Sequence, residues 1–400
     1  EVPRCEVRAR PKIAALVSTY RKHAHAQHIV DRFLEGYGWN SRHHRPEMDV
    51  VSLYVDQVEE DALGAERASR FEHLTVYPTI ADALMLGGSS LAVDGVLLIA
   101  EHGDYSKNDK GQTLWPRYEF FKQMTAVFRA SGGGVPVFND KHLSWNWDWA
   151  REMYEVSREM GFAFMAGSSL PVTWRTPSIE MPLGAEVEEA MSVGVSWIDG
   201  GDFHGLETIQ AMVERRAGGE VGVKWVQAYR GDAFWAAHAR GQWSRELFEA
   251  CLSRSHQLTS ARAGFNHSFP TFDDLRQLAP EAWAYQYEHL DGLLCTMIAL
   301  NGVVGDFSFA ARLAGRDEPL STQMYLPMPP GLANFFSPLV NNIEQMFLTG
   351  RASYPVERTL LTTGLTAAGV ESLHQDQAHQ ETPHLAIAYQ PNPESTYWRA

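Results

Sequence analysis

The sequence is poor in cysteine and in basic side chains, and it has no long apolar run. Its three cysteines, Cys5, Cys251 and Cys295, are too scattered for a disulfide framework or a zinc-ribbon site. We therefore expect free thiols in a reducing, cytoplasmic environment, although the sequence begins at Glu1 rather than methionine, which leaves a removed leader peptide open. No stretch of 18 apolar residues is present, so no membrane span is predicted. With 34 Lys and Arg against 49 Asp and Glu, the chain has no electrostatic attraction for nucleic acid.

Glycine is missing from the turn after the first predicted strand, at residues 18–25 (STYRKHAH). A dinucleotide-binding fold needs glycine there because the backbone must approach the pyrophosphate closely. Tyr20 and Arg21 stand in this turn instead, and Arg21 with the following helix start could hold a smaller anion or form a basic surface turn. Asp56, at the end of the second predicted strand, is placed to contact a ribose hydroxyl. The sequence therefore makes Tyr20, Arg21 and Asp56 candidate cofactor-binding residues, but it argues against NAD(P) itself.

The first half of the chain alternates apolar β-rich runs with helical periodicity. Strands are predicted at 12–20, 48–56, 73–79, 92–100, 135–140 and 161–169, with helices at 25–38 and 79–86 among the connections. Near-continuous apolar strands joined by helices indicate a parallel sheet that is covered on both faces. We therefore predict a Rossmann-like parallel-sheet N-terminal domain at residues 1–175.

The second half of the chain has a different pattern of apolar and polar residues. Alternating apolar and polar residues at 219–231 and 383–391 predict half-exposed antiparallel strands, and 205–217 and 244–255 predict helices. A proline-rich segment near residue 175 favours a boundary there. We predict an α+β C-terminal domain at 176–400, built on an open, mainly antiparallel sheet.

Polar residues follow three successive strands of the predicted parallel sheet. They are Glu101, His102, Asp104 and Tyr105 after the fourth strand, Asn139, Asp140, Lys141 and His142 after the fifth, and Ser168 and Ser169 after the sixth. Ligands of open parallel sheets bind outside the carboxyl ends of the strands. This edge is therefore the expected site, although a solvated sheet edge also carries polar residues.

Two segments resemble those of the Gfo/Idh/MocA family, which includes glucose–fructose oxidoreductase and inositol dehydrogenase. The first is VPVFNDKHLS (135–144), in which Lys141 matches the family's lysine, and the second is DGGDFHGLETIQAMV (199–213), in which His204 matches its histidine. The family's aspartate four residues before the histidine is replaced by Gly200. The resemblance implies a Rossmann-like domain, a second domain on an open sheet, and a sugar- or cyclitol-like substrate in the cleft between them. It also implies that Lys141 and His204 handle the substrate hydroxyl and its proton.

Several imidazoles and carboxylates near this edge suggest a metal site. Glu101, His102, His142 and Glu207 form a ligand set that suits zinc, manganese or iron(II), with Glu207 on the same helix face as His204. Tyr105 and Asp140 complete the predicted catalytic set with Lys141 and His204. The alternative is that Glu101 and Asp104 pair with nearby lysines, Lys107 and Lys110, in a solvated loop.

The function that we predict from the sequence is metal-assisted, non-redox chemistry on a polyhydroxylated small molecule, such as hydrolysis, elimination or isomerisation. The first alternative is an NAD(P)-dependent oxidoreductase with a diverged phosphate turn. The second is a scaffold that binds a ligand or partner without catalysis. The expected partners are a small-molecule substrate and further copies of the chain in a homo-oligomer, with no nucleic acid and no membrane.

Overall fold

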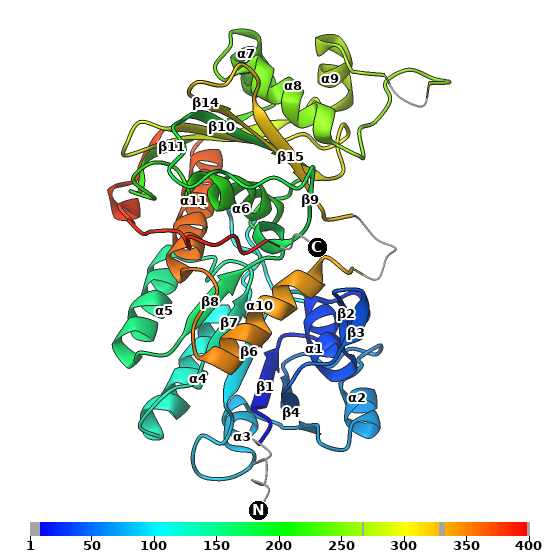
Figure 1. Ribbon diagram of the computed structural model, residues 1–400, viewed down its shortest axis with the longest axis vertical. Helices are drawn as coiled ribbons and strands as arrows, with labels where there is room; N and C mark the ends of the chain where they lie inside the picture. The colour runs from blue at the N-terminus through cyan, green and yellow to red at the C-terminus, as the bar shows by residue number, and fades with distance from the viewer. Residues whose placement is uncertain (1–8, 266–267, 328–332, 398–400) are drawn as a thin grey trace, which may run out of the picture.

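A six-stranded parallel sheet occupies the lower half of the molecule in the computed structural model, which describes residues 9–265, 268–327 and 333–397 (Figure 1). Its strand order is β5-β4-β1-β6-β7-β8. The strands are β1 (Lys12–Val17), β4 (Asp49–Val55), β5 (Thr75–Val76), β6 (Gly95–Ile99), β7 (Val137–Asp140) and β8 (Phe164–Gly167), and all neighbours pair in parallel. This is the strand order of the dinucleotide-binding fold, whose order reverses between β1 and β6. The predicted Rossmann-like sheet is confirmed.

Helices cover both faces of the parallel sheet because its strands are apolar on both sides. α1 (His25–Glu35) and α10 (Phe336–Thr349) pack on one face, and α3 (Ile80–Met85), α4 (Arg117–Ala130) and α5 (Trp147–Met160) pack on the other. Local signals fix the ends of α5: the Asn146 side chain accepts a hydrogen bond from the Trp149 amide at 3.2 Å, and Gly161 ends the helix in the left-handed region. α2 (Gly64–Arg70) and the hairpin of β2 (Tyr37–Trp39) and β3 (Arg42–His44) lie beside this domain's core.

An eight-stranded sheet forms the upper half, in the order β16-β11-β12-β13-β10-β14-β15-β9. The strands are β9 (Arg175–Thr176), β10 (Val187–Gly194), β11 (Val223–Arg230), β12 (Trp283–His289), β13 (Leu294–Ala299), β14 (Phe307–Leu313), β15 (Leu320–Met324) and β16 (Gln380–Glu381). Only β10 and β13 pair in parallel, so the predicted mainly antiparallel sheet is confirmed. The strand predicted at 383–391 is wrong: the segment forms a short 3-10 helix, Pro383–Leu385, and a single bridge between Tyr389 and Glu220.

Two helices separate the sheets. α6 (Gly201–Val213) and α11 (Val356–His374) pack under the second sheet, while α7 (Asp232–Ala239), α8 (Arg245–Arg254) and α9 (Phe272–Leu278) cover its outer face (Figure 1). Every residue of α6 is buried, including the polar side chains of Asp202, His204 and Glu207. α6 therefore brings second-domain side chains directly onto the edge of the first sheet.

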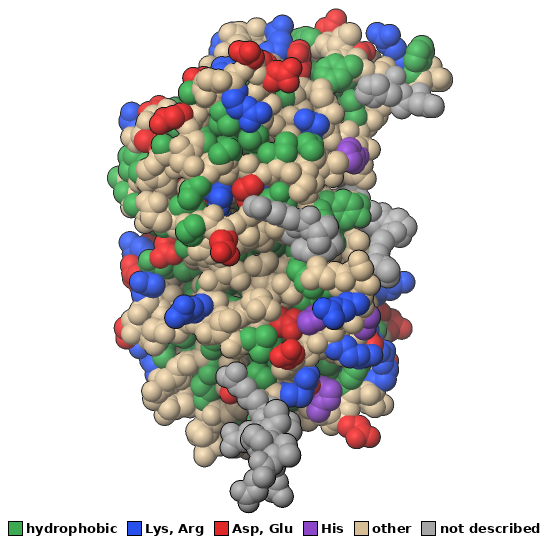
Figure 2. All heavy atoms as spheres, in the orientation of Figure 1, with side chains coloured by type: hydrophobic (Ala, Val, Ile, Leu, Met, Phe, Trp, Pro, Cys, Tyr) green, Lys and Arg blue, Asp and Glu red, His purple; other side chains and the backbone are tan. Residues whose placement is uncertain are grey.

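The remaining general predictions concern the surface and the chain's environment. On the face shown in Figure 2, Lys and Arg side chains are interspersed with Asp and Glu. Cys251 and Cys295 are buried free thiols, and Cys5 lies outside the described residues. Among the described helices, none is both long and apolar enough to cross a membrane. The division at residue 175, the cytoplasmic location and the absence of a nucleic-acid partner stay predictions.

Candidate active site

Lys141 and His204 meet where the two domains face each other. Lys141 directly follows β7, and its backbone takes a left-handed conformation with φ of 68° while its amide donates to the Gly167 carbonyl at 3.1 Å. This turn sends the side chain toward the first turn of α6, where Lys141 Nζ lies 2.6 Å from His204 Nε2. Lys141 is only 2% exposed. The pair that the family resemblance implied is therefore in direct contact.

Glu101 holds a fixed negative charge beside this pair. Its Oε1 lies 3.8 Å from Lys141 Nζ, and its other oxygen is bonded to Arg117, whose side chain is fully buried at the start of α4. Burial alone would raise the pKa of the Glu101 carboxyl, but Lys141 and Arg117 lower it far below its usual range. Glu101 is therefore held in buried ion pairs and does not pair with a lysine of the surface loop. Lys110 of the predicted alternative pairs with Glu371 instead.

The other nitrogen of His204 begins a second set of contacts. His204 Nδ1 lies 3.1 Å from Ser168 Oγ, and Ser168 Oγ is bonded to Glu207. The Ser168 amide also donates to Glu207 Oε1 at 3.1 Å. Burial raises the pKa of Glu207 to about 7, and burial and Lys141 lower the pKa of His204 well below its usual value. His204 is therefore neutral, and Glu207 titrates near neutrality.

A third group of buried side chains lies on the other side of His142. His142 Nε2 lies 3.3 Å from Asp199 Oδ1, which also accepts a hydrogen bond from Gln112 at 3.1 Å. Asp202 accepts backbone hydrogen bonds from Asp199, Gly200 and Phe203 and so organises the start of α6. Burial and Asp199 raise the pKa of Asp202 to about 7.

The predicted metal site is wrong. Each proposed ligand has a separate partner: Glu101 binds Arg117, His142 faces Asp199, Glu207 binds Ser168, and His102 accepts from the His25 amide at 3.4 Å. Within the described residues, no group of three or more His, Cys, Asp or Glu is arranged to hold a metal ion. The sequence placed these residues on one edge but carried no information on the directions of their side chains.

Two residues predicted to be catalytic have partners of their own. Asp140 Oδ2 lies 2.7 Å from His25 Nδ1 at the start of α1, and its Oδ1 is buried without a hydrogen-bond partner in the described part of the chain. The Tyr105 hydroxyl donates to Asp56 at 2.7 Å, and burial together with Asp56 raises its pKa well above the usual value. The structure thus brings Asp140 to the sheet edge near Lys141, but places Tyr105 with Asp56.

The Tyr20 side chain does not cover the turn after β1. Tyr20 is fully buried, and its hydroxyl donates to Asp31 of α1, so its ring lies in the core rather than over the turn. Arg21 pairs with Glu59 at 2.7 Å. The expectation that bulky side chains at this turn argue against NAD(P) is wrong, because it overlooked the inward direction of Tyr20.

Trp197 stands at the solvent side of the pair. It is 49% exposed, and its ring centre lies 5.9 Å from Lys141 Nζ and 6.2 Å from the His204 ring. A Cβ atom added to Gly200 would meet the Trp197 ring at 2.2 Å. The tryptophan therefore fills the space that a side chain at position 200 would need, which is where the resembled family carries aspartate.

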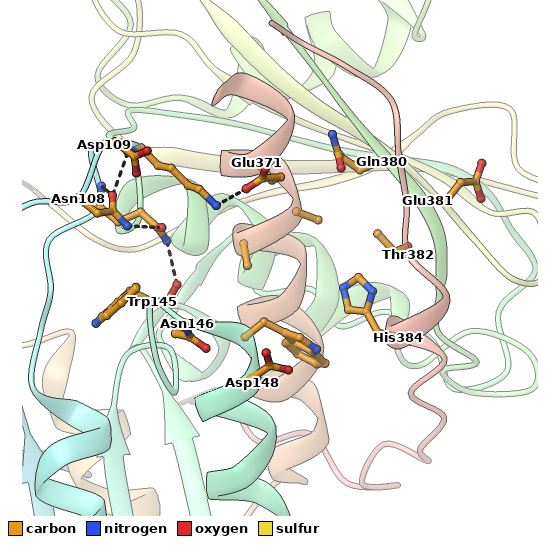
Figure 3. Close-up of a pocket in the computed structure, with 15 residues that line it drawn as sticks. Asn108, Asp109, Trp145, Asn146, Asp148, Glu371, Gln380, Glu381, Thr382 and His384 are labelled. Atoms are coloured by element: carbon orange, nitrogen blue, oxygen red, sulfur yellow. Dashed lines mark hydrogen bonds and ion pairs between the residues drawn. The ribbon is translucent and has the colours of Figure 1, made fainter. Parts of the chain in front are cut away.

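A pocket of about 500 Å³ lies behind the site, between the loop before α4, the start of α5, and α11 (Figure 3). Trp145, Asn146, Glu371 and His384 are among its lining residues. Gln112 also lines it and donates to both the Trp145 carbonyl and Asp199. Gln112 and Asp199 thus lie one after the other between the pocket and His142.

The sequence analysis missed Arg117, Gln112 and the role of Ser168. Ser168 was placed at the expected edge because it directly follows β8, but its contact with Glu207 could not be foreseen. Gln112 lies in the loop before α4 and Arg117 is the first residue of α4, and neither carries a local signal that would bring it back to Asp199 or Glu101.

No family model matches the sequence, and no curated protein matches it. Solved structures do match. Scyllo-inositol dehydrogenase from Lactobacillus casei with bound NAD(H) and scyllo-inositol is 12% identical with a TM-score of 0.56, covering 93% of this chain and 99% of that one. GenD2 from gentamicin A biosynthesis, in complex with NAD, is 13% identical with a TM-score of 0.55, covering 93% and 96%. A probable dehydrogenase from Thermotoga maritima is 10% identical with a TM-score of 0.57, covering 94% and 99%.

These neighbours overturn the prediction of metal-assisted hydrolysis, elimination or isomerisation, and with it the preference for a divalent metal over NAD(P). They are dehydrogenases and oxidoreductases, and two of them hold NAD or NAD(H). At these identities the likeness establishes the architecture, and over most of its length this chain has the two-domain fold of the Gfo/Idh/MocA-type dehydrogenases that its lysine and histidine segments resemble.

Proposed function

We propose that the protein is an NAD(P)-dependent oxidoreductase that acts on a secondary alcohol of a sugar, cyclitol or similar polyhydroxylated molecule. The observation that carries the proposal is the 2.6 Å contact between Lys141 and His204 at the carboxyl edge of a sheet with the dinucleotide-binding strand order. The structural neighbours that hold NAD, one of them with scyllo-inositol, support it.

The residues at the switch point between β1 and β6 fit a dinucleotide. Thr19 Oγ1, directly after β1, is buried and has no hydrogen-bond partner among the described residues. The amino end of α1 has no side-chain cap, which leaves its first-turn amides for phosphate oxygens. The His102 ring lies against one of these amides and must turn away for a phosphate to reach it. Asp56, exposed at the end of β4, would hold the ribose hydroxyls.

The side chains of the pair suit alcohol oxidation. When bound, the nicotinamide ring supplies the hydride acceptor. Lys141 and His204 would bind the substrate hydroxyl and take up its proton as the carbonyl forms. His204 can accept or share a proton because its low pKa keeps the imidazole neutral. The exposed face of Trp197 would pack against the apolar face of a ring-shaped polyol.

The test is binding and turnover by the purified chain. We expect NADH or NADPH to bind by calorimetry, and nicotinamide reduction with at least one member of a panel of inositols and aldoses. Lys141→Met should lower kcat/KM by about 10²–10⁴-fold without changing the cofactor Kd. Lys122→Met, an exposed lysine on α4 paired with Glu152, is the matched control.

Failure of both cofactors to bind would contradict the proposal. Polyol binding without turnover, unchanged in Lys141→Met, would instead favour a ligand-binding scaffold. A homo-oligomer is part of the proposal, supported by exposed apolar side chains on the second domain such as Phe265 and Leu290. Light scattering on the purified chain tests this, and a monomer would refute it.

A further inference from the structure

A continuous line of hydrogen bonds runs inward from Lys141. Lys141 Nζ lies 2.6 Å from His204 Nε2, His204 Nδ1 lies 3.1 Å from Ser168 Oγ, and Ser168 Oγ is bonded to Glu207. The donors and acceptors are in a consistent order. The ammonium donates to Nε2, the imidazole carries its proton on Nδ1 and donates to the hydroxyl, and the hydroxyl donates to the carboxylate.

The backbone at Gly167 leaves space for the carboxyl group of Glu207, the last residue of this hydrogen-bonded chain. Gly167 has φ of 122°, and a Cβ atom built on it would meet Glu207 Oε1 at 2.6 Å. The Ser168 amide fixes the same oxygen at 3.1 Å. Glu207 is buried on α6, and no lysine or arginine among the described residues is bonded to it. The charged and titratable groups that influence it are Lys141 after β7, Arg358 on α11, and Tyr354 before α11, together with His204 on its own helix.

We propose that Ser168 and Glu207 form a proton relay that lets Lys141 act as the base, which replaces the aspartate that is absent at Gly200. This inference rests on the proposed oxidoreductase function. A proton leaves the Lys141 ammonium for His204 Nε2, the Nδ1 proton moves to Ser168, and the Ser168 proton moves to Glu207. The result is a neutral Lys141 amine and a protonated Glu207, with no change in the total charge of the site.

The chemical step then balances. The neutral Lys141 amine would take the hydroxyl proton of the alcohol as the carbonyl forms, and a bound oxidised nicotinamide would supply the acceptor for the hydride that the carbon loses. When the product leaves, the Lys141 ammonium gives one proton to water and the relay runs in reverse, which restores the Glu207 carboxylate, the Nδ1 proton of His204 and the Lys141 ammonium. Burial raises the pKa of Glu207 to about 7, which makes this carboxylate a better proton acceptor than an ordinary glutamate.

The kinetic test compares Glu207→Gln and Ser168→Ala with Ser168→Thr and with the exposed control Glu249→Gln on α8. In the wild type, kcat for alcohol oxidation should rise with pH through about 7. Glu207→Gln and Ser168→Ala should lower kcat about 100-fold at neutral pH and move the rise to more alkaline pH. Ser168→Thr, which keeps a hydroxyl, should recover part of the rate. An equal loss at all pH values, with the midpoint unmoved, would show a structural role and overturn the relay.

A second measurement separates this inference from the proposed function. Nitrogen-15 spectra of the histidine rings report the tautomer of His204 in the protein without any cofactor, with His204→Gln used to assign the signal. We expect a neutral ring with its proton on Nδ1, whose shifts follow a titration near pH 7 that is lost in Glu207→Gln. A proton on Nε2, or a titration that persists in the variant, overturns the relay even if the enzyme oxidises polyols. The expected spectra in a protein without turnover would support the relay and reject the oxidoreductase.

Discussion

Two buried carboxyl groups near α6 have opposite surroundings. Glu207 is bonded to a serine hydroxyl and a backbone amide, whereas Glu220 is bonded to Arg216 at 3.0 Å, His289 at 2.9 Å and the amides of Val221 and Gly222. Burial would raise the pKa of both carboxyls. His289 and Arg216 lower that of Glu220 far below its usual range, while that of Glu207 stays at about 7.

The comparison distinguishes buried carboxylates that stabilise the fold through ion pairs from buried carboxyl groups that can exchange a proton. Glu214, at the end of α6, is also of the first kind, since Arg358 donates two hydrogen bonds to it and the Tyr389 hydroxyl a third. Beside its arginine partner, Glu220 has a lowered pKa, which keeps that carboxylate charged at neutral pH. A buried carboxyl without such a partner exchanges protons near neutrality, which is the property of active-site groups.

The largest expected effect is on stability, at the arginine-paired group. Arg358→Met leaves the buried Glu214 carboxylate without its cation and should lower the free energy of unfolding by about 3–5 kcal/mol. Urea denaturation at neutral pH measures this. Arg151→Met on α5, whose acidic partners are exposed, is the control and should change stability little. Equal effects of the two substitutions would remove the distinction between the two kinds of charge.

The pH dependence of stability should differ in sign between the two carboxyls. The pKa of Glu207 is raised from 4.5 to about 7 in the folded protein, so the folded state loses stability as pH rises from about 5 to 8. Glu207→Gln removes this loss and should gain about 3 kcal/mol relative to the wild type over that range.

Glu220→Gln should behave in the opposite way. Its lowered pKa contributes stability that is fully present above its usual value and lost as pH falls through the acid range. The cost of Glu220→Gln should therefore be constant from neutral pH down to about 5 and shrink below that. Urea denaturation of Glu207→Gln and Glu220→Gln at several pH values tests both expectations. If the free energy of unfolding changed with pH in the same way in the two variants, the opposite pKa shifts of the two carboxyls would be contradicted.

The smallest expected effect is at the exposed tryptophan. Trp197→Ala should raise KM for the polyol about three- to tenfold, in line with an aromatic contact of about 1 kcal/mol, and change kcat less. Trp243, buried in the outer core of the second domain, provides the opposite case: Trp243→Phe should affect stability and leave KM alone. An unchanged KM in Trp197→Ala would place the substrate elsewhere.

The fold could be predicted from the sequence because the sequence patterns that indicate it are local and repeated. Near-continuous apolar strands joined by helical periodicity predicted the parallel sheet and its covering helices, and the strand ends predicted the edge that carries Lys141. The segment 383–391 misled because its alternation reflects packing against α11 and β11 rather than pairing in the sheet.

Only part of the candidate site could be predicted from the sequence. Lys141 and His204 could be identified because each is embedded in a recognisable segment. The erroneous metal site shows what was missing: Glu101 is held by Arg117, a residue that becomes its neighbour only through the loop before α4, and His102 turns toward α1. Side-chain directions and distant partners decide whether a cluster of ligands exists, and neither is written in the spacing of residues.

The complete burial of α6 has a mechanical consequence. One end of this helix presents His204 to Lys141 of the other domain, while its far end is anchored by Glu214 to Arg358 of α11. A helix clamped along its whole length moves as a rod, so any rotation of one domain against the other must shift His204 relative to Lys141. The 2.6 Å contact between Lys141 and His204 therefore depends on the relative orientation of the two halves of the molecule.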